Sequence, residues 1–100
     1  MPVPNAREIL DMEFKGQPNV MTPEVVKIGK LHPQIAYEVS VGVGMDGRPI
    51  YGVSLVRWDW SGKTVRLREH SKCVESRKAA NEYLDELRNN VADLLVWRDE

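Results

Sequence analysis

The sequence is poor in cysteine, has no long hydrophobic run and carries no excess of charge of either sign. A single cysteine, Cys73, excludes an intramolecular disulfide framework and is typical of a reducing compartment, which favours a cytoplasmic protein. The longest aliphatic or aromatic run, residues 94–97, is too short to cross a bilayer, so no membrane is expected as a partner. Residues 1–10 lack the basic and apolar regions of a signal peptide. Fourteen Lys and Arg residues face fifteen Asp and Glu residues, whereas a dedicated nucleic-acid-binding domain is usually basic.

The remaining composition is that of one globular domain. Hydrophobic residues make up 42% and charged residues 29% of the 100 positions, which is too apolar for a disordered chain. A chain of this length buries about 60–70% of the surface that its unfolded form exposes, enough for one core. We therefore predict a single domain over residues 1–100.

The first third of the chain predicts a short helix followed by an ambiguous segment. Asn5 and Glu8 have capping-box spacing, so residues 1–22 are expected to form a short helix and a loop. Residues 23–34 begin with proline and contain Gly29, an arrangement typical of the two ends of a short helix. The β-branched residues of the same segment favour a strand: Val25, Val26 and Ile28. We prefer the strand, and the helix stays open as the alternative.

Residues 35–70 predict an antiparallel meander. Apolar residues alternate with small or polar ones over residues 35–45, which is the pattern of a half-buried strand. The dipeptides at 46–47 and 61–62 are turn signals, and they separate this strand from a second at 50–60 and a third at 64–70.

The lengths of the two loops determine which side chains share a face of this sheet. If each loop has three residues and its glycine is left-handed, Val41 lies beside Tyr51 and Leu55 lies beside Leu67. One face is then apolar throughout and is expected to pack on the C-terminal helix: Tyr37, Val39, Val41, Val43, Tyr51, Val53, Leu55, Val65 and Leu67. With two-residue loops, the apolar residues of the first strand would instead face Gly52 and Ser54.

Residues 75–96 predict one amphipathic helix of about 20 residues. Its apolar residues recur at helical spacing on one stripe: Ala80, Tyr83, Leu84, Leu87, Val91, Leu94 and Leu95. The predicted fold class is therefore α+β. An antiparallel three- or four-stranded meander sheet carries a long C-terminal amphipathic helix on one face, preceded by a short N-terminal helix.

The second face of the predicted sheet combines tryptophan with cationic residues. Tryptophan supplies rigid contact area and a π face, so this composition is typical of a binding surface. The candidate binding surface has six residues: Trp58, Trp60, Lys63, Arg66, Arg68 and His70. The alternative is that residues 1–34 cover this face, because their own apolar residues must also be buried. Both interpretations stay open.

Charge is segregated along the chain. Residues 57–78 hold seven positive and three negative groups, a net charge of +4, and residues 79–100 hold two positive and six negative groups, a net charge of −4. The plainest interpretation of the basic stretch is a solvated strand edge whose charges prevent aggregation. The same stretch could also meet the acidic helix of a second copy, or contact phosphates while its tryptophans stack on bases.

Motifs for catalysis, cofactors and metals are weak. Residues 42–47 match G-x-G-x-x-G, but a strand rather than a helix is expected to follow, so the dinucleotide-binding context is absent. His70 and Cys73 could supply two metal ligands, whereas a structural zinc site needs four. The same two residues could act as a base and a nucleophile, but the sequence shows no third residue to orient the base. We expect Cys73 to be half-buried at a strand–helix junction. We predict no enzymatic activity, catalytic residue, metal or cofactor.

The layout of residues 50–88 resembles that of two nucleic-acid-binding families. Strands, a Ser-Arg-Lys-Ala-Ala helix start and Tyr83 follow one another as in the arm-site DNA-binding domain of phage integrases and the double-stranded RNA-binding domain. The lysine-rich cluster of the RNA-binding domain has only Arg77 and Lys78 as counterparts here. The resemblance implies nucleic acid as a partner.

These patterns predict a small non-enzymatic binding module. We expect it to self-associate as a homodimer, through a strand edge or the Trp/Arg face, or to bind a protein partner through that face. The alternative is that the same face binds single-stranded DNA or RNA.

Overall fold

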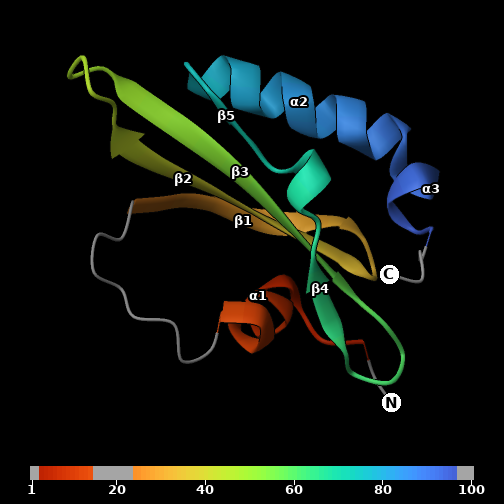
Figure 1. Ribbon diagram of the computed structural model, residues 1–100. Coiled ribbons are helices and arrows are strands. Elements are labelled where there is room, and N and C mark those ends of the chain that lie inside the picture. Colours follow the sequence, from red (N-terminus) through yellow and green to blue (C-terminus); the bar gives the residue numbers. More distant parts are fainter. Residues whose placement is uncertain (1–2, 15–23, 97–100) are drawn as a thin grey trace.

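A computed structural model of the chain describes residues 3–14 and 24–96 as a curved antiparallel sheet with helices on both faces (Figure 1). The elements follow in the order α1 (Ala6–Phe14), β1 (Glu24–His32), β2 (Ile35–Val43), β3 (Pro49–Trp58), β4 (Thr64–Arg66), the 3₁₀ helix η1 (Arg68–His70), β5 (Lys72–Val74), α2 (Arg77–Asn89) and α3 (Val91–Leu94). Strands β1 to β4 lie side by side in chain order, and β5 also pairs with β3. The α+β meander predicted from the sequence is confirmed.

The N-terminal third follows its local signals. The backbone N–H of Glu8 donates to Asn5 Oδ1 over 2.9 Å, and Asn5 Nδ2 donates to Glu8 Oε1 over 2.8 Å, so these residues cap α1 as predicted. The ambiguous segment forms β1, because its β-branched residues pair along β2. The loop expected at the end of residues 1–22 falls on positions outside the described residues.

Both hairpins have the predicted loops and register. Gly47 and Gly62 adopt φ angles of 80° and 87°, which glycine reaches at low cost. In each loop the N–H of the first flanking residue donates to the carbonyl of the second: Gly44 to Arg48 over 2.8 Å and Asp59 to Lys63 over 2.9 Å. The β2–β3 ladder therefore has the predicted pairs: Val41 with Tyr51, Val39 with Val53 and Tyr37 with Leu55.

The predicted third strand over residues 64–70 is wrong beyond Arg66. The chain leaves the ladder at η1 and returns as β5, which pairs with β3 at residues 51–53. Ser71 Oγ accepts a hydrogen bond from the Leu55 N–H over 3.2 Å and donates to the Leu67 carbonyl over 2.9 Å. The His70 carbonyl accepts a hydrogen bond from the Tyr83 hydroxyl. Side-chain hydrogen bonds therefore replace ladder bonds through this turn.

The predicted C-terminal helix over residues 75–96 is interrupted. Its first part, α2, begins after Ser76, whose Oγ accepts from the Ala79 N–H over 3.1 Å. Asn90 leaves the helical conformation, with φ −121° and ψ 28°, and its Nδ2 donates to the Glu86 carbonyl over 2.9 Å. A short second helix, α3, follows and keeps Leu94 buried.

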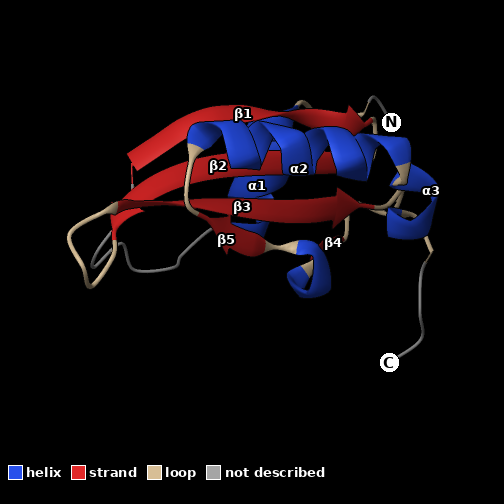
Figure 2. Ribbon diagram, turned by 90° about the horizontal axis from the view of Figure 1, so that it is seen from above, coloured by secondary structure: helices blue, strands red, loops and turns tan. Residues whose placement is uncertain are grey.

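Each face of the sheet has its own core. On the α2 face, which carries Tyr37, Val53 and Leu55, α2 and α3 cover β1 to β3 (Figure 2). The buried residues of this core are Ile35, Tyr37, Val39, Val53, Leu55, Ala80, Leu84, Leu87 and Leu94. Val43 was expected in it but is 81% exposed, because it lies near the tip of the β2–β3 hairpin.

On the α1 face, which carries Ala36, Val56 and Trp58, helix α1 packs on a smaller core. Its buried residues are Ile9, Leu10, Ala36, Val56 and Trp58. The question left open by the sequence is thereby answered for Trp58: the N-terminal helix covers it.

Candidate functional site

The outer edge of β4 borders an open groove of about 840 Å³. Strand β4 is the last of the four consecutive strands, and among the described residues no further strand pairs with its outer edge. The groove is lined by residues of α1, β3, segment 63–70 (which includes β4 and η1) and α3, and by one residue of the tail that follows α3: Glu13, Arg57, Lys63, Thr64, Val65, Arg66, Leu67, Arg68, Glu69, His70, Asp93, Leu94 and Val96.

The pairing of β4 with β3 determines where its backbone groups point. The Lys63 carbonyl accepts from the Asp59 N–H over 2.9 Å, and the Leu67 N–H donates to the Leu55 carbonyl over 2.9 Å. Lys63 and Leu67 therefore turn their backbone groups toward β3. Because backbone groups alternate between the two edges of an antiparallel strand, those of Thr64 and Arg66 point toward the groove.

The two helical layers form the walls of the groove. On the α1 face, the Thr64 hydroxyl donates to Glu13 of α1 over 3.3 Å. On the α2 face lie residues 93–96, which Arg57 holds in place: its Nη1 donates to the carbonyls of Leu94 and Val96, over 2.8 Å each. The buried cation thus caps the C-terminal end of α3. Burial lowers the pKa of Arg57, and the neighbouring Asp59 carboxylate partly offsets this effect.

The two tryptophans of the candidate binding surface differ in exposure. Trp58 is 2% exposed under α1, so the prediction that it belongs to a binding surface is wrong in this fold. Trp60 is 59% exposed and packs edge-on against Trp58, with ring centroids 5.4 Å apart and planes at 72°. The buried ring thus supports the exposed ring.

The loop that carries Trp60 is held by one carboxylate. Asp59 Oδ1 accepts from the Ser61 N–H over 3.0 Å, the Ser61 hydroxyl over 2.6 Å and the Lys63 N–H over 2.9 Å. These bonds, with that of the Ser61 hydroxyl foremost, lower the pKa of Asp59.

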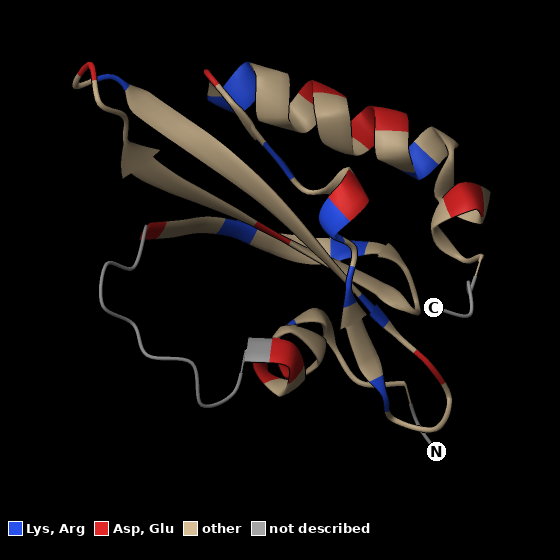
Figure 3. Cartoon of the chain, viewed as in Figure 1, with Lys and Arg blue, Asp and Glu red and all other residues tan. Residues whose placement is uncertain are grey.

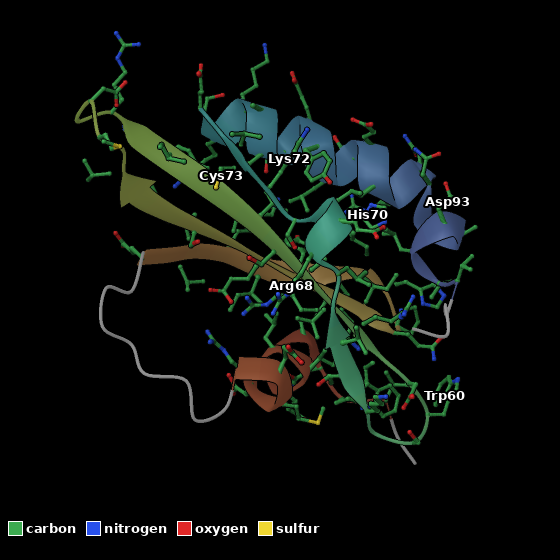
Figure 4. The ribbon with its side chains drawn as sticks, viewed as in Figure 1. Trp60, Arg68, His70, Lys72, Cys73 and Asp93 are labelled. Atoms are coloured by element: carbon green, nitrogen blue, oxygen red, sulfur yellow. The ribbon has the colours of Figure 1, made fainter. Side chains whose placement is uncertain are left out.

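The other four predicted residues lie together along the groove: Lys63, Arg66, Arg68 and His70. Arg68 and His70 belong to η1, while Trp60 lies at the far end of β4 on the hairpin (Figure 4). The η1 segment is held by the Tyr83 hydroxyl, and the Lys72 ammonium lies 4.0 Å from the centre of the Tyr83 ring.

Sequence reasoning missed the acidic residues of the groove. Glu13, Glu69 and Asp93 line it from α1, η1 and α3, so the groove has mixed charge. Figure 3 shows the basic residues of β4 and η1 in blue and the acidic residues of α2 and α3 in red. Only Glu69 is a sequence neighbour of the basic cluster. The other two come from distant segments, and no local pattern places them there.

Cys73 was expected to be half-buried and is instead exposed. Cys73 lies on β5 and pairs with Gly52 of β3. Within residues 3–14 and 24–96, no three His, Cys, Asp or Glu side chains are grouped as metal ligands.

Among the described helices, none has both the length and the hydropathy needed to cross a bilayer. No protein-family model, curated protein sequence or solved structure matches this chain.

Proposed function

We propose that the protein is a non-enzymatic binding module that holds a protein partner in the groove beside β4. The observation that carries this proposal is the position of β4: an edge strand lines an open groove together with residues of α1 and α3. Grooves of this kind suit extended segments of other proteins, because an edge strand offers backbone donors and acceptors.

The opposite edge of the sheet is less suited to binding. Strand β1 carries Lys27 and Lys30, and two irregularities interrupt its pairing with β2. Bulges on an edge strand discourage the addition of another strand, whereas β4 pairs with β3 without interruption over residues 64–66. This difference in regularity supports β4 as the edge that binds.

The mixed charge of the groove favours a protein partner over nucleic acid. Polyphosphate would be attracted by Lys63 and Arg68 but repelled by Glu69 and Asp93 in the same groove. A protein surface can complement both signs of charge. The exposed ring of Trp60 adds a rigid contact at one end of β4.

A second copy of the chain is the first protein partner to consider. The exposed acidic residues of α2 are complementary in charge to the basic residues of β4 and η1: Glu82, Asp85 and Glu86. A two-fold contact would use the basic and the acidic surface of each copy once, giving a closed homodimer. Sedimentation at micromolar concentrations tests this directly, since the chain has a mass of 11.4 kDa.

A variant-resolved capture experiment tests the proposed groove. Wild-type protein and the variants Trp60→Ala/Arg68→Ala and Arg77→Ala are immobilised and exposed to a cell extract. We expect the double variant to lose the partners that wild type retains, while Arg77→Ala at the exposed start of α2 keeps them. Retention of every partner by the double variant would place binding elsewhere.

Single-stranded nucleic acid is the second candidate ligand, favoured by the exposed Trp60 beside Lys63. A stacked base contributes about 1–3 kcal/mol, so Trp60→Ala should weaken oligonucleotide binding about tenfold. Titration of a labelled oligonucleotide at low salt measures this. Absence of binding by wild type would remove this candidate and leave the protein-binding proposal in place.

A further inference from the structure

The two hairpin loops of the sheet share one backbone arrangement and carry different side chains. In the β2–β3 loop, the Gly44 N–H donates to the Arg48 carbonyl over 2.8 Å, and the Gly47 N–H donates to the Gly44 carbonyl over 3.0 Å. In the β3–β4 loop, the N–H groups of Asp59 and Gly62 make the corresponding bonds, over 2.9 Å and 3.0 Å. Both loops therefore close in the same way, although one begins with glycine and the other with aspartate.

The Asp59 side chain adds hydrogen bonds that closing this loop does not require. Its Oδ1 accepts from the Ser61 N–H, the Ser61 hydroxyl and the Lys63 N–H. The β2–β3 loop closes with Gly44 in the same position, and glycine has no side chain to accept such bonds. Because the bonds from Asp59 to Ser61 and Lys63 span Trp60, their effect is to fix the backbone that carries this ring.

The second residue of each loop is apolar, and only one of the two rests on the core. Met45 of the β2–β3 loop is fully exposed, whereas Trp60 is 59% exposed and packs on Trp58, with ring centroids 5.4 Å apart. Trp58 is itself buried under α1. Trp60 is thus held through its backbone by Asp59 and through its ring by Trp58, while more than half of its surface stays open to solvent (Figure 4).

A rigid and exposed tryptophan is well suited to anchor a protein interface. Tryptophan is enriched among the residues that contribute most of the binding energy at interfaces. A side chain that is already held in place loses less entropy when a partner binds. The ring is also tied to the groove, because Lys63, which lines the groove, donates to the same Asp59 carboxylate.

Building on the proposed function, we propose that Trp60 anchors the protein partner of the groove and that Asp59 is the residue that positions Trp60. Asp59 acts through geometry: one oxygen atom accepts the three bonds that fix the loop. An uncharged side chain of the same shape, with an oxygen in the same place, should therefore replace it.

A peptide selected on the wild-type protein from a phage-displayed random library serves as the probe, and calorimetry measures its affinity for the full-length chain. We expect Trp60→Ala and Asp59→Ala each to weaken binding at least about tenfold. Asp59→Asn keeps the acceptor oxygen and should stay within about twofold of wild type. Asp46→Ala is the matched control, since it removes a carboxylate bonded to the Arg48 N–H in the other loop, and should bind like wild type.

Circular dichroism tests whether Asp59 acts through Trp60. Two indole rings 5.4 Å apart couple and give paired bands of opposite sign, whose intensity depends on their mutual orientation. Wild type and Asp59→Asn should show this signal, Trp60→Ala should remove it, and Asp59→Ala should reduce it. A residue that only stabilised the fold would lower the free energy of unfolding and leave the indole signal and the affinity of the folded protein unchanged.

Asp59 does not position Trp60 if folded Asp59→Ala retains the wild-type affinity or the wild-type indole signal, or if Asp59→Asn binds as weakly as Asp59→Ala. Should Asp59→Ala fail to fold, Asp59→Gly takes its place, because it copies Gly44 of the other loop. A selection that yields no peptide dependent on Trp60 also overturns the anchor. Partner capture that is lost in Arg68→Ala and kept in Trp60→Ala would overturn the anchor and leave the proposed function standing.

Discussion

The two faces of the sheet are built from the same strands but differ in how far their cores extend. On the α2 face, a continuous core runs beneath α2 and α3 and includes Val39 and Val53 in the middle of the hairpin. On the α1 face, burial is concentrated where Ala36, Val56 and Trp58 meet α1. Between Ile35 and Tyr37, and between Leu55 and Trp58, every residue is buried, whichever face it points to.

This difference explains where the groove lies. The sheet is packed on both faces at the end where β3 pairs with β4, while at the other end Val43 projects into solvent. The groove beside β4 therefore adjoins the part of the sheet that is buried on both faces. If this groove binds a partner as proposed, close packing around it would reduce the entropy lost on binding.

Trp58→Ala should have the largest effect on stability. The side chain is 2% exposed and forms the centre of the core under α1, so its truncation should cost about 3–5 kcal/mol. Trp60→Ala is the matched control two residues away, since it removes a largely exposed ring and one aromatic pair worth about 0.5–1.5 kcal/mol. Urea unfolding of both variants measures the difference. Equal losses would mean that α1 does not cover Trp58 in solution.

Leu87→Ala tests the core on the α2 face. Leu87 is 6% exposed and packs with Val39, Val53 and Leu55 beneath α2, so truncation should cost about 2–5 kcal/mol. The adjacent exposed Glu86 provides the control, and Glu86→Ala should change the unfolding free energy by no more than about 0.5 kcal/mol. A loss for Leu87→Ala as small as that of the control would mean that α2 docks through another stripe.

Most of the α2 face could be predicted from the sequence, and most of the α1 face could not. Alternation along β2, the two turn glycines and the helical stripe all point to the same register, so independent local signals agree. On the α1 face, the polar residues Glu38 and Ser54 lie among Ala36, Val56 and Trp58. In a sequence, this mixture of polar and apolar residues is typical of a solvated surface. Only the docking of α1, a long-range event, makes part of that face a core.

The candidate site was predicted only in part, because local sequence signals indicate some of its residues and long-range contacts bring in the others. Lys63, Arg66, Arg68 and His70 are near neighbours in the sequence, so their clustering is visible in composition alone. The walls of the groove, with Glu13 on one side and Val96 on the other, come from opposite ends of the chain and have no local signature. The turn of the chain at η1 also escaped prediction, because it depends on hydrogen bonds that Ser71 makes across the fold.

Glu38→Gln should have the smallest effect, and one that depends on pH. Glu38 points to the α1 face, where burial raises its pKa; Arg7 and Arg66 partly oppose the shift, and Asp11 adds to it. A carboxyl whose pKa is raised in the folded state contributes stability that is present below its unfolded pKa of 4.5 and lost as pH rises through the folded pKa.

The wild-type protein therefore bears the cost of a half-buried carboxylate at neutral pH, and glutamine removes it. We expect the unfolding free energy of Glu38→Gln, relative to that of wild type, to be higher at about pH 7 than at about pH 3.5. Urea unfolding at the two pH values measures this, since both side chains are neutral under the acidic condition. Glu82→Gln, on the exposed surface of α2, controls for the loss of a carboxylate as such. A stability difference for Glu38→Gln that is the same at both pH values would mean that α1 leaves this carboxylate in contact with water, and would extend the solvated part of the α1 face to Glu38.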